Sequence, residues 1–212
     1  MMCNSTEAAQ ARSRLKHIRL ALWLLVALLA GFALLYLVGP EPEAALDEPV
    51  DYGDTVGGAF SLTAPDGSTV TDQTLKGQPF AIFFGFTRCP DVCPTTLSRL
   101  AQLRKRMGED GEKFQIVFVS VDPGYDSPED IGRYVDLFGT PIIGLTGSDD
   151  AIAEVADAYH AFYEKVPVEG GDYTIDHTAA VYLMGADGKL QSIIDYHESP
   201  AASLAKLEGL IG

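Results

Sequence analysis

The sequence predicts an α/β domain, and two observations carry this prediction. Residues 80–86 and 114–121 are continuous apolar runs of strand length, which is typical of strands buried on both faces of a sheet. Each run is followed by a segment in which apolar residues recur at helical spacing. A succession of strand, helix, strand and helix indicates a parallel arrangement.

Before the first buried strand, residues 59–62 and 68–70 flank the turn signal Pro65-Asp66-Gly67, so we expect a short hairpin there. After this strand, Pro94 suits the first position of a helix. That helix continues through apolar residues at helical spacing and ends before Gly108: Leu97, Leu100, Leu103 and Met107.

The second half of the domain changes from parallel units to a hairpin. The expected elements are a helix at 127–138, a short strand at 141–145, a helix at 149–159, strands at 178–184 and 190–196, and a helix at 200–211. This order is that of a thioredoxin-like fold with an additional N-terminal β-hairpin, covering residues 58–212.

The domain is expected to be preceded by one transmembrane helix at residues 20–38. This segment carries no charge, and about 20 apolar residues at 1.5 Å each span a hydrocarbon core of roughly 30 Å. Trp23 and Tyr36 lie near its two ends, where aromatic rings favour the membrane interface. The alternative is a cleaved secretory signal, but the apolar segment is longer than usual and lacks a clean small-x-small site.

Charge on either side of this segment predicts its orientation. Residues 1–19 contain four basic residues and one acidic residue, whereas the chain after residue 38 contains 29 acidic and 11 basic residues. A basic flank before the helix predicts a cytoplasmic N-terminal tail and an exported domain. Residues 39–57 form an acidic, Pro-containing linker. Since the tail is not a long Arg/Ser-rich presequence, we expect a single-pass protein of the bacterial inner membrane with a periplasmic C-terminal domain.

The overall charge narrows the choice of partners. The net charge is −15, and basic residues cluster only in the tail and at Arg104-Lys105-Arg106. Nucleic acid is therefore not expected as a partner, because phosphate binding requires clustered Lys and Arg.

Cys89 and Cys93 lie directly after the first buried strand and at the start of the helix. The partial positive charge of a helix N-terminus stabilises thiolate over thiol, and thiolate is both the nucleophile and the metal ligand. The two sulfurs could close a disulfide or bind one ion. A purely structural disulfide is the alternative, although so short a loop would contribute little stability.

Two thiolates are an incomplete site for most metals, so the metal that binds depends on whether a histidine is a third ligand. A structural zinc site takes four ligands, and Cys3 cannot supply one because it is expected on the other side of the membrane. Copper(I) accepts fewer and softer ligands, and an imidazole also suits copper(II). His17 flanks the predicted membrane helix, His160 lies near a helix end where it would pack or cap, and His197 lies in a loop. His177 enters a strand that we expect to lie beside the cysteines. The residues alone do not decide whether His177 is a metal ligand or a structural residue.

The residues quoted so far, with two further motifs, resemble the Sco/SenC copper-binding proteins that help assemble cytochrome c oxidase. The similar segments are Gly-Phe-Thr-Arg-Cys-Pro-Asp-Val-Cys-Pro-Thr-Thr-Leu from Gly85, Val-Ser-Val-Asp-Pro from Val119, and Asp-His-Thr-Ala-Ala-Val-Tyr-Leu from Asp176. The resemblance implies that Cys89, Cys93 and His177 bind copper as Cu(I) or Cu(II).

The same resemblance assigns weaker expectations to four aspartates and one proline. Asp91 and Asp176 could supply an oxygen contact, with solvation or turn capping as the alternative. Asp122, Asp126 and Pro128 match the family's second motif, which we expect to shape the loop beside the site and which could also contact a partner.

By resemblance, the function is that of a membrane-anchored copper chaperone for the dinuclear copper centre of cytochrome c oxidase subunit II, with an upstream copper donor or thiol reductant as a further partner. The alternative is a thiol-disulfide reductase that keeps the oxidase's copper-ligand cysteines reduced, with Cys89 and Cys93 cycling through a redox disulfide. Two residues separate the cysteines of ordinary thioredoxin-type oxidoreductases, and here there are three, which weakens general disulfide exchange. A copper or redox sensor would leave no distinctive mark in the sequence.

Overall fold

A computed structural model describes residues 22–31 and 55–212. The chain divides into two units, residues 1–50 and 51–212, which are described separately. In the first unit, residues 22–31 form an α-helix with exposed side chains. Within the described ranges, no helix is both long enough and apolar enough to cross a membrane. The described residues therefore lend no support to the transmembrane helix predicted at 20–38, both ends of which lie outside them, as do the tail 1–19 and residues 39–54 of the linker.

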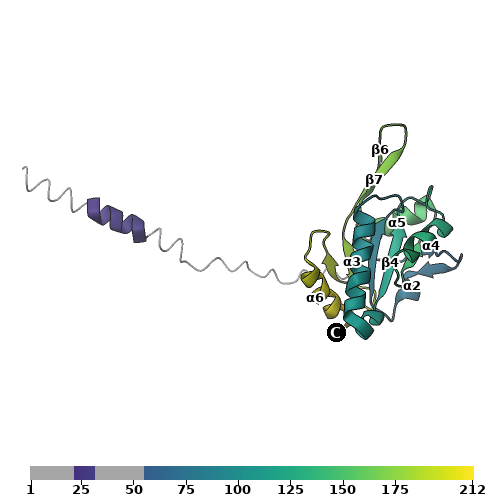
Figure 1. Cartoon of the computed structure of the whole chain (residues 1–212), viewed down its shortest axis with the longest axis horizontal. Coiled ribbons are helices and arrows are strands. Elements are labelled where there is room, and N and C mark those ends of the chain that lie inside the picture. Colours follow the sequence, from purple (N-terminus) through teal and green to yellow (C-terminus); the bar gives the residue numbers. More distant parts are fainter. Residues whose placement is uncertain (1–21, 32–54) are drawn as a thin grey trace, which may run out of the picture. The chain divides into compact units, whose positions relative to one another are not determined.

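The second unit is built on a five-stranded sheet with the order β5-β4-β3-β8-β9 (Figure 1). β3 lies at its centre, parallel to β4 on one side and antiparallel to β8 on the other. The strands are β3 (Phe80–Gly85), β4 (Gln115–Ser120), β5 (Ile143–Leu145), β8 (Val181–Met184) and β9 (Leu190–Ile194). The predicted combination of parallel units followed by a hairpin is confirmed.

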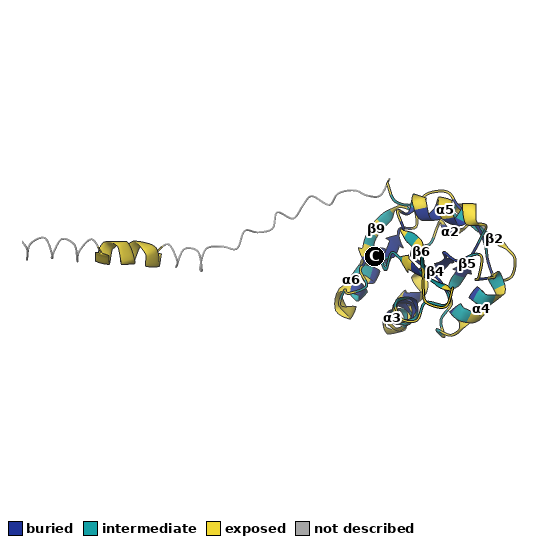
Figure 2. Cartoon of the chain, turned by 90° about the horizontal axis from the view of Figure 1, so that it is seen from above, coloured by how far each residue is buried: buried dark blue, intermediate teal, exposed yellow. Residues whose placement is uncertain are grey.

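Helices cover both faces of this sheet, as Figure 2 shows from above. On one face lie α3 (Val92–Met107), α4 (Pro128–Asp136) and α6 (Pro200–Ile211). The other face carries α5 (Asp149–Ala158) and the short helix α2 (Asp72–Leu75). Because the connections β3-α3-β4 and β4-α4-β5 progress in the same direction across the sheet, the right-handed crossover rule places their helices on the same face.

The core lies between the sheet and these two helical layers. Every residue of β3 is buried, as are five of the six residues of β4. Strands covered on both faces have no solvent-facing side, which is why their sequences show no polar alternation. Opposite the sheet, α3 contributes a stripe of buried side chains at helical spacing: Cys93, Thr96, Leu97, Leu100 and Leu103.

Two small hairpins lie outside the central sheet. The predicted N-terminal hairpin is present as β1 (Ser61–Thr63) and β2 (Thr69–Thr71). The second hairpin, β6 (Tyr163–Pro167) and β7 (Tyr173–His177), was not predicted, and it projects from the body of the domain (Figure 1). The turn between its strands contains Gly170 and Gly171, both with positive φ, so this pair of glycines was the available sequence signal.

Two predicted boundaries near the site are corrected by the structure, and one short helix was not predicted. Helix α3 begins at Val92 and not at Pro94, because the first-turn N–H groups have no helical partner and proline is tolerated there. The strand predicted at 178–184 begins only at Val181, as β8, and His177 does not enter it but ends the separate strand β7. A 3-10 helix, η2 (Gly108–Lys113), follows α3.

Candidate metal centre

The connection from β3 to α3 brings the two cysteines to the edge of the sheet. The backbone N–H of Cys89 donates to the carbonyl of Phe86 at 3.2 Å, which closes a turn directly after the strand. Cys93 lies in the first turn of α3, and its backbone N–H donates to the Cys89 sulfur at 3.4 Å. The helix N-terminus therefore directs an unpaired N–H group at one of the two sulfurs, as predicted from the sequence.

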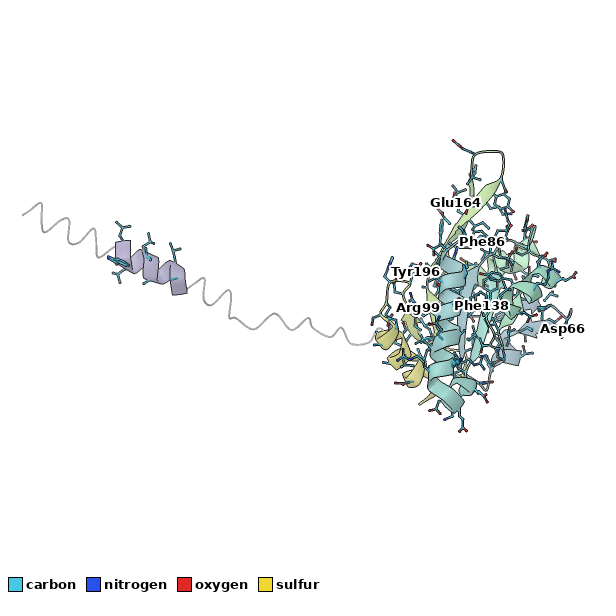
Figure 3. All side chains as sticks on the ribbon, in the orientation of Figure 1. Asp66, Phe86, Arg99, Phe138, Glu164 and Tyr196 are labelled. Atoms are coloured by element: carbon cyan, nitrogen blue, oxygen red, sulfur yellow. The ribbon has the colours of Figure 1, made fainter. Side chains whose placement is uncertain are left out.

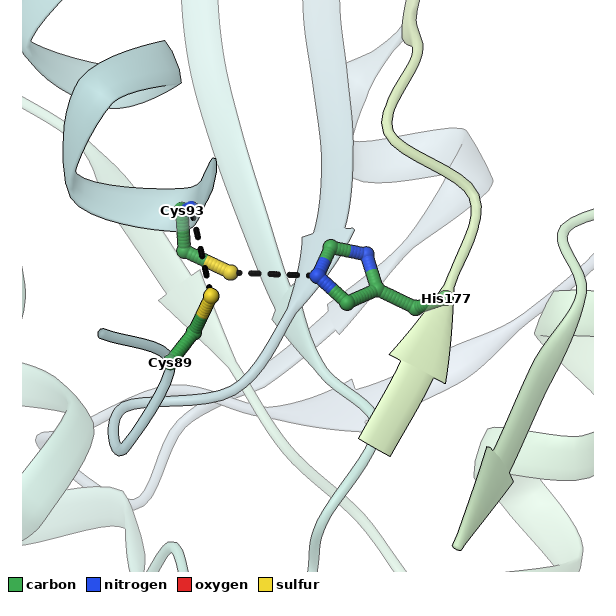
Figure 4. Close-up of side chains that lie close together, drawn as sticks. All are labelled: Cys89, Cys93 and His177. Carbon is green, nitrogen blue, oxygen red and sulfur yellow. Dashed lines mark hydrogen bonds between the residues drawn. The ribbon is translucent and has the colours of Figure 1, made fainter. Parts of the chain in front are cut away.

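His177 completes a group of three donor atoms. Its Nε2 lies 3.4 Å from the Cys93 sulfur, as Figure 4 shows. The ligand atoms of Cys89, Cys93 and His177 all lie within 4.8 Å of one another. Cys93 is fully buried, whereas Cys89 and His177 are half-buried, so the group is open to solvent on one side.

The imidazole of His177 is held in one orientation by its surroundings. Nδ1 lies 3.1 Å from the carbonyl of Thr178, to which Nδ1–H can donate, and Nε2 is the ring nitrogen that faces the sulfurs. The rings of Phe83 and Phe86 meet the imidazole edge-on, at centroid distances of 5.8 and 5.9 Å. An oriented imidazole with its second nitrogen hydrogen-bonded is the usual arrangement of a metal-ligating histidine.

The two thiols have very different acidities. A hydrogen bond from the Cys93 thiol lowers the pKa of Cys89 to about 3, and contacts with His177 and the Cys93 backbone N–H act in the same direction. Donation to Cys89 and burial together raise the pKa of Cys93. The pair thus shares one proton, with the negative charge on the more exposed sulfur.

Gly85 forms the wall behind the buried sulfur. A β-carbon at this position would lie 2.6 Å from the Cys93 sulfur, 3.1 Å from the Phe118 ring and 3.2 Å from the Phe83 ring. Only glycine leaves room for the sulfur, the strand and both rings at this point. Its role was missed in the sequence, where a glycine inside a buried strand was the available signal.

The second motif does shape the loop that carries the cysteines. Asp126, which is 1% exposed, accepts hydrogen bonds from the backbone N–H of Thr87 at 2.9 Å, the Thr87 hydroxyl at 2.6 Å and the Ser120 hydroxyl at 2.6 Å. Asp122 is fully buried and accepts a hydrogen bond from Arg88. Pro128 begins helix α4.

The remaining candidates are not part of this group. Asp91 is exposed, and its carboxylate accepts a hydrogen bond from the Thr95 hydroxyl at 3.2 Å. Among the described residues, neither Asp91 nor Asp176 shares a donor cluster with the two cysteines. His160 lies in a left-handed conformation just after α5, and its Nε2 lies 2.9 Å from the Thr55 carbonyl, so its predicted place at a helix end is confirmed. His197 is exposed, and Cys3 and His17 lie outside the described residues.

Two comparisons identify the relatives of this chain. The model of the SCO1/SenC family matches residues 49–212. The chain belongs to the SCO1/SenC family. An SCO2-like protein from Rickettsia felis is 34% identical over 193 residues, which cover 88% of this chain and 94% of the relative. The mitochondrial SCO1 homolog 1 of Arabidopsis thaliana is 41% identical over 133 residues, which cover 62% of this chain and 40% of that protein, so this SCO1/SenC chain matches less than half of its length.

Solved structures agree with this membership and with the thioredoxin-like α/β fold. The copper-bound structure of Bradyrhizobium japonicum ScoI is 42% identical and superposes with a TM-score of 0.68, covering 73% of this chain and 99% of that one. BsSco, described as a member of the Sco family of cytochrome c oxidase assembly proteins with a disulfide switch, is 26% identical. It superposes with a TM-score of 0.61 and covers 77% of this SCO1/SenC chain and 96% of its own.

Proposed function

We propose that this chain is a membrane-anchored copper chaperone that binds Cu(I) and Cu(II) through Cys89, Cys93 and His177. It would assist assembly of the dinuclear copper centre of cytochrome c oxidase subunit II. The observation that carries the proposal is the convergence of two sulfurs and one imidazole nitrogen within 4.8 Å. Copper bound to a 42% identical relative of the same fold supports the choice of metal.

The donor set fits copper by its chemistry. Thiolate ligands select soft metals such as Cu(I), and imidazole also suits Cu(II). A structural zinc site takes four protein ligands, and only three donor atoms converge among the described residues. Cys89 is already a thiolate, so the metal-free protein offers one ligand without losing a proton.

The different exposures of the ligands suit transfer by exchange. Cys89 is the more accessible sulfur, and Cys93 is buried. A thiolate of the receiving protein would bind the copper ion as Cys89 leaves, and a second would replace Cys93. Copper then passes between proteins without release of a free ion, and Cys89 and Cys93 are left reduced.

Copper titration of the full-length protein tests the site. The titration is monitored by absorbance and electron paramagnetic resonance. We expect one copper ion to bind per chain, and the affinity to fall strongly in Cys89→Ala, Cys93→Ala and His177→Ala. His197→Ala is the matched control, because His197 is exposed and outside the donor group. Unchanged stoichiometry and affinity in all three site variants would refute the proposal.

The membrane part of the proposal concerns residues 20–38. An uncharged apolar segment after a basic tail supports a single-pass anchor in a bacterial inner membrane, with a cytoplasmic N-terminus and a periplasmic domain. We expect the protein to resist extraction from membranes at alkaline pH, and a variant lacking residues 1–38 to be released. Extraction of the full-length chain under the same conditions would contradict the anchor.

The low pKa of Cys89 favours one second function, reduction of the oxidase's copper-ligand cysteines. The Cys89 thiolate would attack a disulfide of the receiving protein and form a mixed disulfide, releasing one thiolate. Cys93, after giving its proton to that thiolate, would attack the Cys89 sulfur and release the second. The receiving protein gains two electrons, Cys89 and Cys93 become a disulfide, and an external dithiol must reduce it.

His177→Ala separates the two functions. The substitution removes an imidazole ligand but neither sulfur, so it should impair Cu(II) binding and leave dithiol exchange largely intact. In cells with limiting copper, we expect this variant to fail in oxidase assembly. Full restoration of assembly by His177→Ala would instead favour the reductase.

A further inference from the structure

Asp122 is a fully buried carboxylate that three cationic or hydroxyl groups approach. Its Oδ2 accepts a hydrogen bond from Arg88 Nη2 at 3.1 Å. Its Oδ1 accepts a hydrogen bond from the Tyr173 hydroxyl at 2.7 Å and lies 3.3 Å from Lys165 Nζ. A buried carboxylate is costly unless it is paired and hydrogen-bonded, so these contacts stabilise one another.

The partners of Asp122 come from the two segments that supply the metal ligands. Arg88 immediately precedes Cys89 in the loop from β3. Lys165 and Tyr173 lie on the β6–β7 hairpin, and Tyr173 is the first residue of the strand that His177 ends. Asp122 thus contacts both the cysteine loop and the hairpin that carries the histidine.

Arg88 reinforces the same connection. Its guanidinium lies 3.9 Å from the centre of the Tyr125 ring and 4.8 Å from that of the Tyr173 ring. Its Nη1 also lies 3.3 Å from Oδ1 of Asp172, the residue immediately before the second hairpin strand. These contacts place one arginine between the cysteine loop and the hairpin.

The hairpin requires such a connection because it is not part of the central sheet. Within the part of the chain that the structure describes, β6 and β7 pair only with each other, and a two-stranded hairpin alone is marginally stable in water. Most of the hairpin's side chains are exposed or half-buried. In Figure 3, Glu164 marks the projecting hairpin and Phe86 marks the region near its base. At that base, the Thr178 N–H donates to the Phe162 carbonyl at 2.9 Å.

We infer that Asp122 is a positioning residue that sets the place of His177 relative to Cys89 and Cys93 by holding Arg88 and Tyr173 together. Asp126 provides the contrast, because within the described residues its carboxylate accepts hydrogen bonds from Thr87 and Ser120 and from no residue of the hairpin. The expected effect of Asp122 on copper binding rests on the proposed function, whereas its expected effect on the position of the hairpin does not.

Two substitutions in the full-length protein test the inference. Tyr173→Phe removes only the hydroxyl and keeps the ring on Arg88, and Asp122→Asn removes the charge. Tyr125→Phe is the matched control, since its ring also stacks on Arg88 and its hydroxyl makes no hydrogen bond within the described ranges. The measurements are amide hydrogen exchange at residues 173–177 without metal, the rate of Cu(II) removal by a chelator, and the Cu(II) paramagnetic spectrum.

We expect amide exchange and Cu(II) removal to be about tenfold faster in Tyr173→Phe and Asp122→Asn, as for a loss of about 1.4 kcal/mol. The Cu(II) spectrum should broaden, because the imidazole occupies several positions, while the number of Cu(I) ions bound through the sulfurs is unchanged. Tyr125→Phe should match the wild type in each measurement.

Unchanged amide exchange in Tyr173→Phe would overturn the inference, and so would an equal change in Tyr125→Phe. If Asp122→Asn fails to fold, Tyr173→Phe decides alone. If the wild-type protein binds no copper, the proposed function fails, and the metal-free exchange measurement still decides whether Asp122 holds the hairpin.

Discussion

Cys93 and Gly85 show, at the scale of single residues, how tightly the site is packed. The Cys93 sulfur lies between the backbone of β3 and the imidazole of His177. The Phe83 ring and the Phe118 ring also lie close to Gly85. In a close-packed interior, an added methyl group must displace one of its neighbours.

Gly85→Ala should therefore destabilise the domain and disturb the site together. We expect the free energy of unfolding to fall by about 1–3 kcal/mol, as is typical of an overpacked core, with weaker copper binding. Urea unfolding and copper titration measure the two effects. Gly209→Ala in α6 is the control, because an added β-carbon there meets no atom within 4 Å apart from its chain neighbours and the backbone of its own helix. Equal stability of Gly85→Ala and the wild type would show that the sulfur has room to move.

The acidity of Cys89 leads to a prediction of its reactivity in the metal-free protein. Because its pKa is lowered to about 3, the thiolate is lost only when the pH falls through that value. Between pH 8 and pH 5 an ordinary thiol, with a pKa near 8.5, loses thiolate by roughly three orders of magnitude. We expect the alkylation rate of Cys89, followed by mass spectrometry, to change little over this range.

Cys93→Ala tests the cause of that acidity. The substitution removes the S–H donor that contributes most to the low pKa of Cys89. The alkylation rate of Cys89 should then fall as the pH is lowered from 8 to 5. A Cys89 rate that falls with pH already in the wild type would contradict the assignment of the negative charge to this sulfur.

At the scale of elements, the site is assembled by segments that begin or end beside it. The loop after β3 presents Cys89, the first turn of α3 presents Cys93, and the last residue of β7 presents His177. The loop between β4 and α4 supplies the carboxylates that hold the first of these segments. Each metal ligand thus lies at or near the end of a strand or helix, and these elements fix its position.

Asp126→Asn tests the loop that joins β4 to α4. The asparagine would keep one acceptor oxygen in place of two and would carry no charge, so the hydrogen bonds that Thr87 and Ser120 donate to this buried side chain would be fewer and weaker. We expect a loss of about 1–3 kcal/mol in the free energy of unfolding, measured in urea. Asp136→Asn is the control, because Asp136 is exposed on α4 and surface changes have small effects. A midpoint equal to that of the control would show that the loop does not depend on this carboxylate.

At the scale of the whole molecule, residues 51–212 form one compact unit with a single core. The core is closed on one face by α6, whose Leu207 and Leu210 are 0% and 5% exposed. A domain of this kind is expected to fold without the rest of the chain.

A fragment of residues 51–212 should unfold in one cooperative transition and bind copper with the affinity of the full-length chain. Removal of residues 200–212 from this fragment should abolish that transition, because even truncation of one buried leucine to alanine costs about 2–5 kcal/mol and two buried leucines are lost here. Circular dichroism during urea unfolding and copper titration provide the measurements. A gradual transition in the longer fragment would show that the first 50 residues contribute to folding.

The sequence by itself determined the strands of the central sheet, the helices α3, α4, α5 and α6, and the place of the two cysteines. Continuous apolar runs and helical spacing are local signals, and Cys89 and Cys93 lie within a few residues of the strand and helix that position them. Helix α6 was predicted with the bounds that the structure shows, because Pro200 and the apolar residues after it give a clear start and periodicity.

Only the tertiary structure decided how distant segments meet. His177 lies 84 positions after Cys93, and the residues alone left its role open until the family resemblance was considered. The β6–β7 hairpin and the contacts of Asp122 with Arg88 and Tyr173 were not predicted. The physical reason is that local patterns specify which residues form a strand or helix, whereas strand order and the packing of an exposed hairpin bring a histidine to a pair of sulfurs.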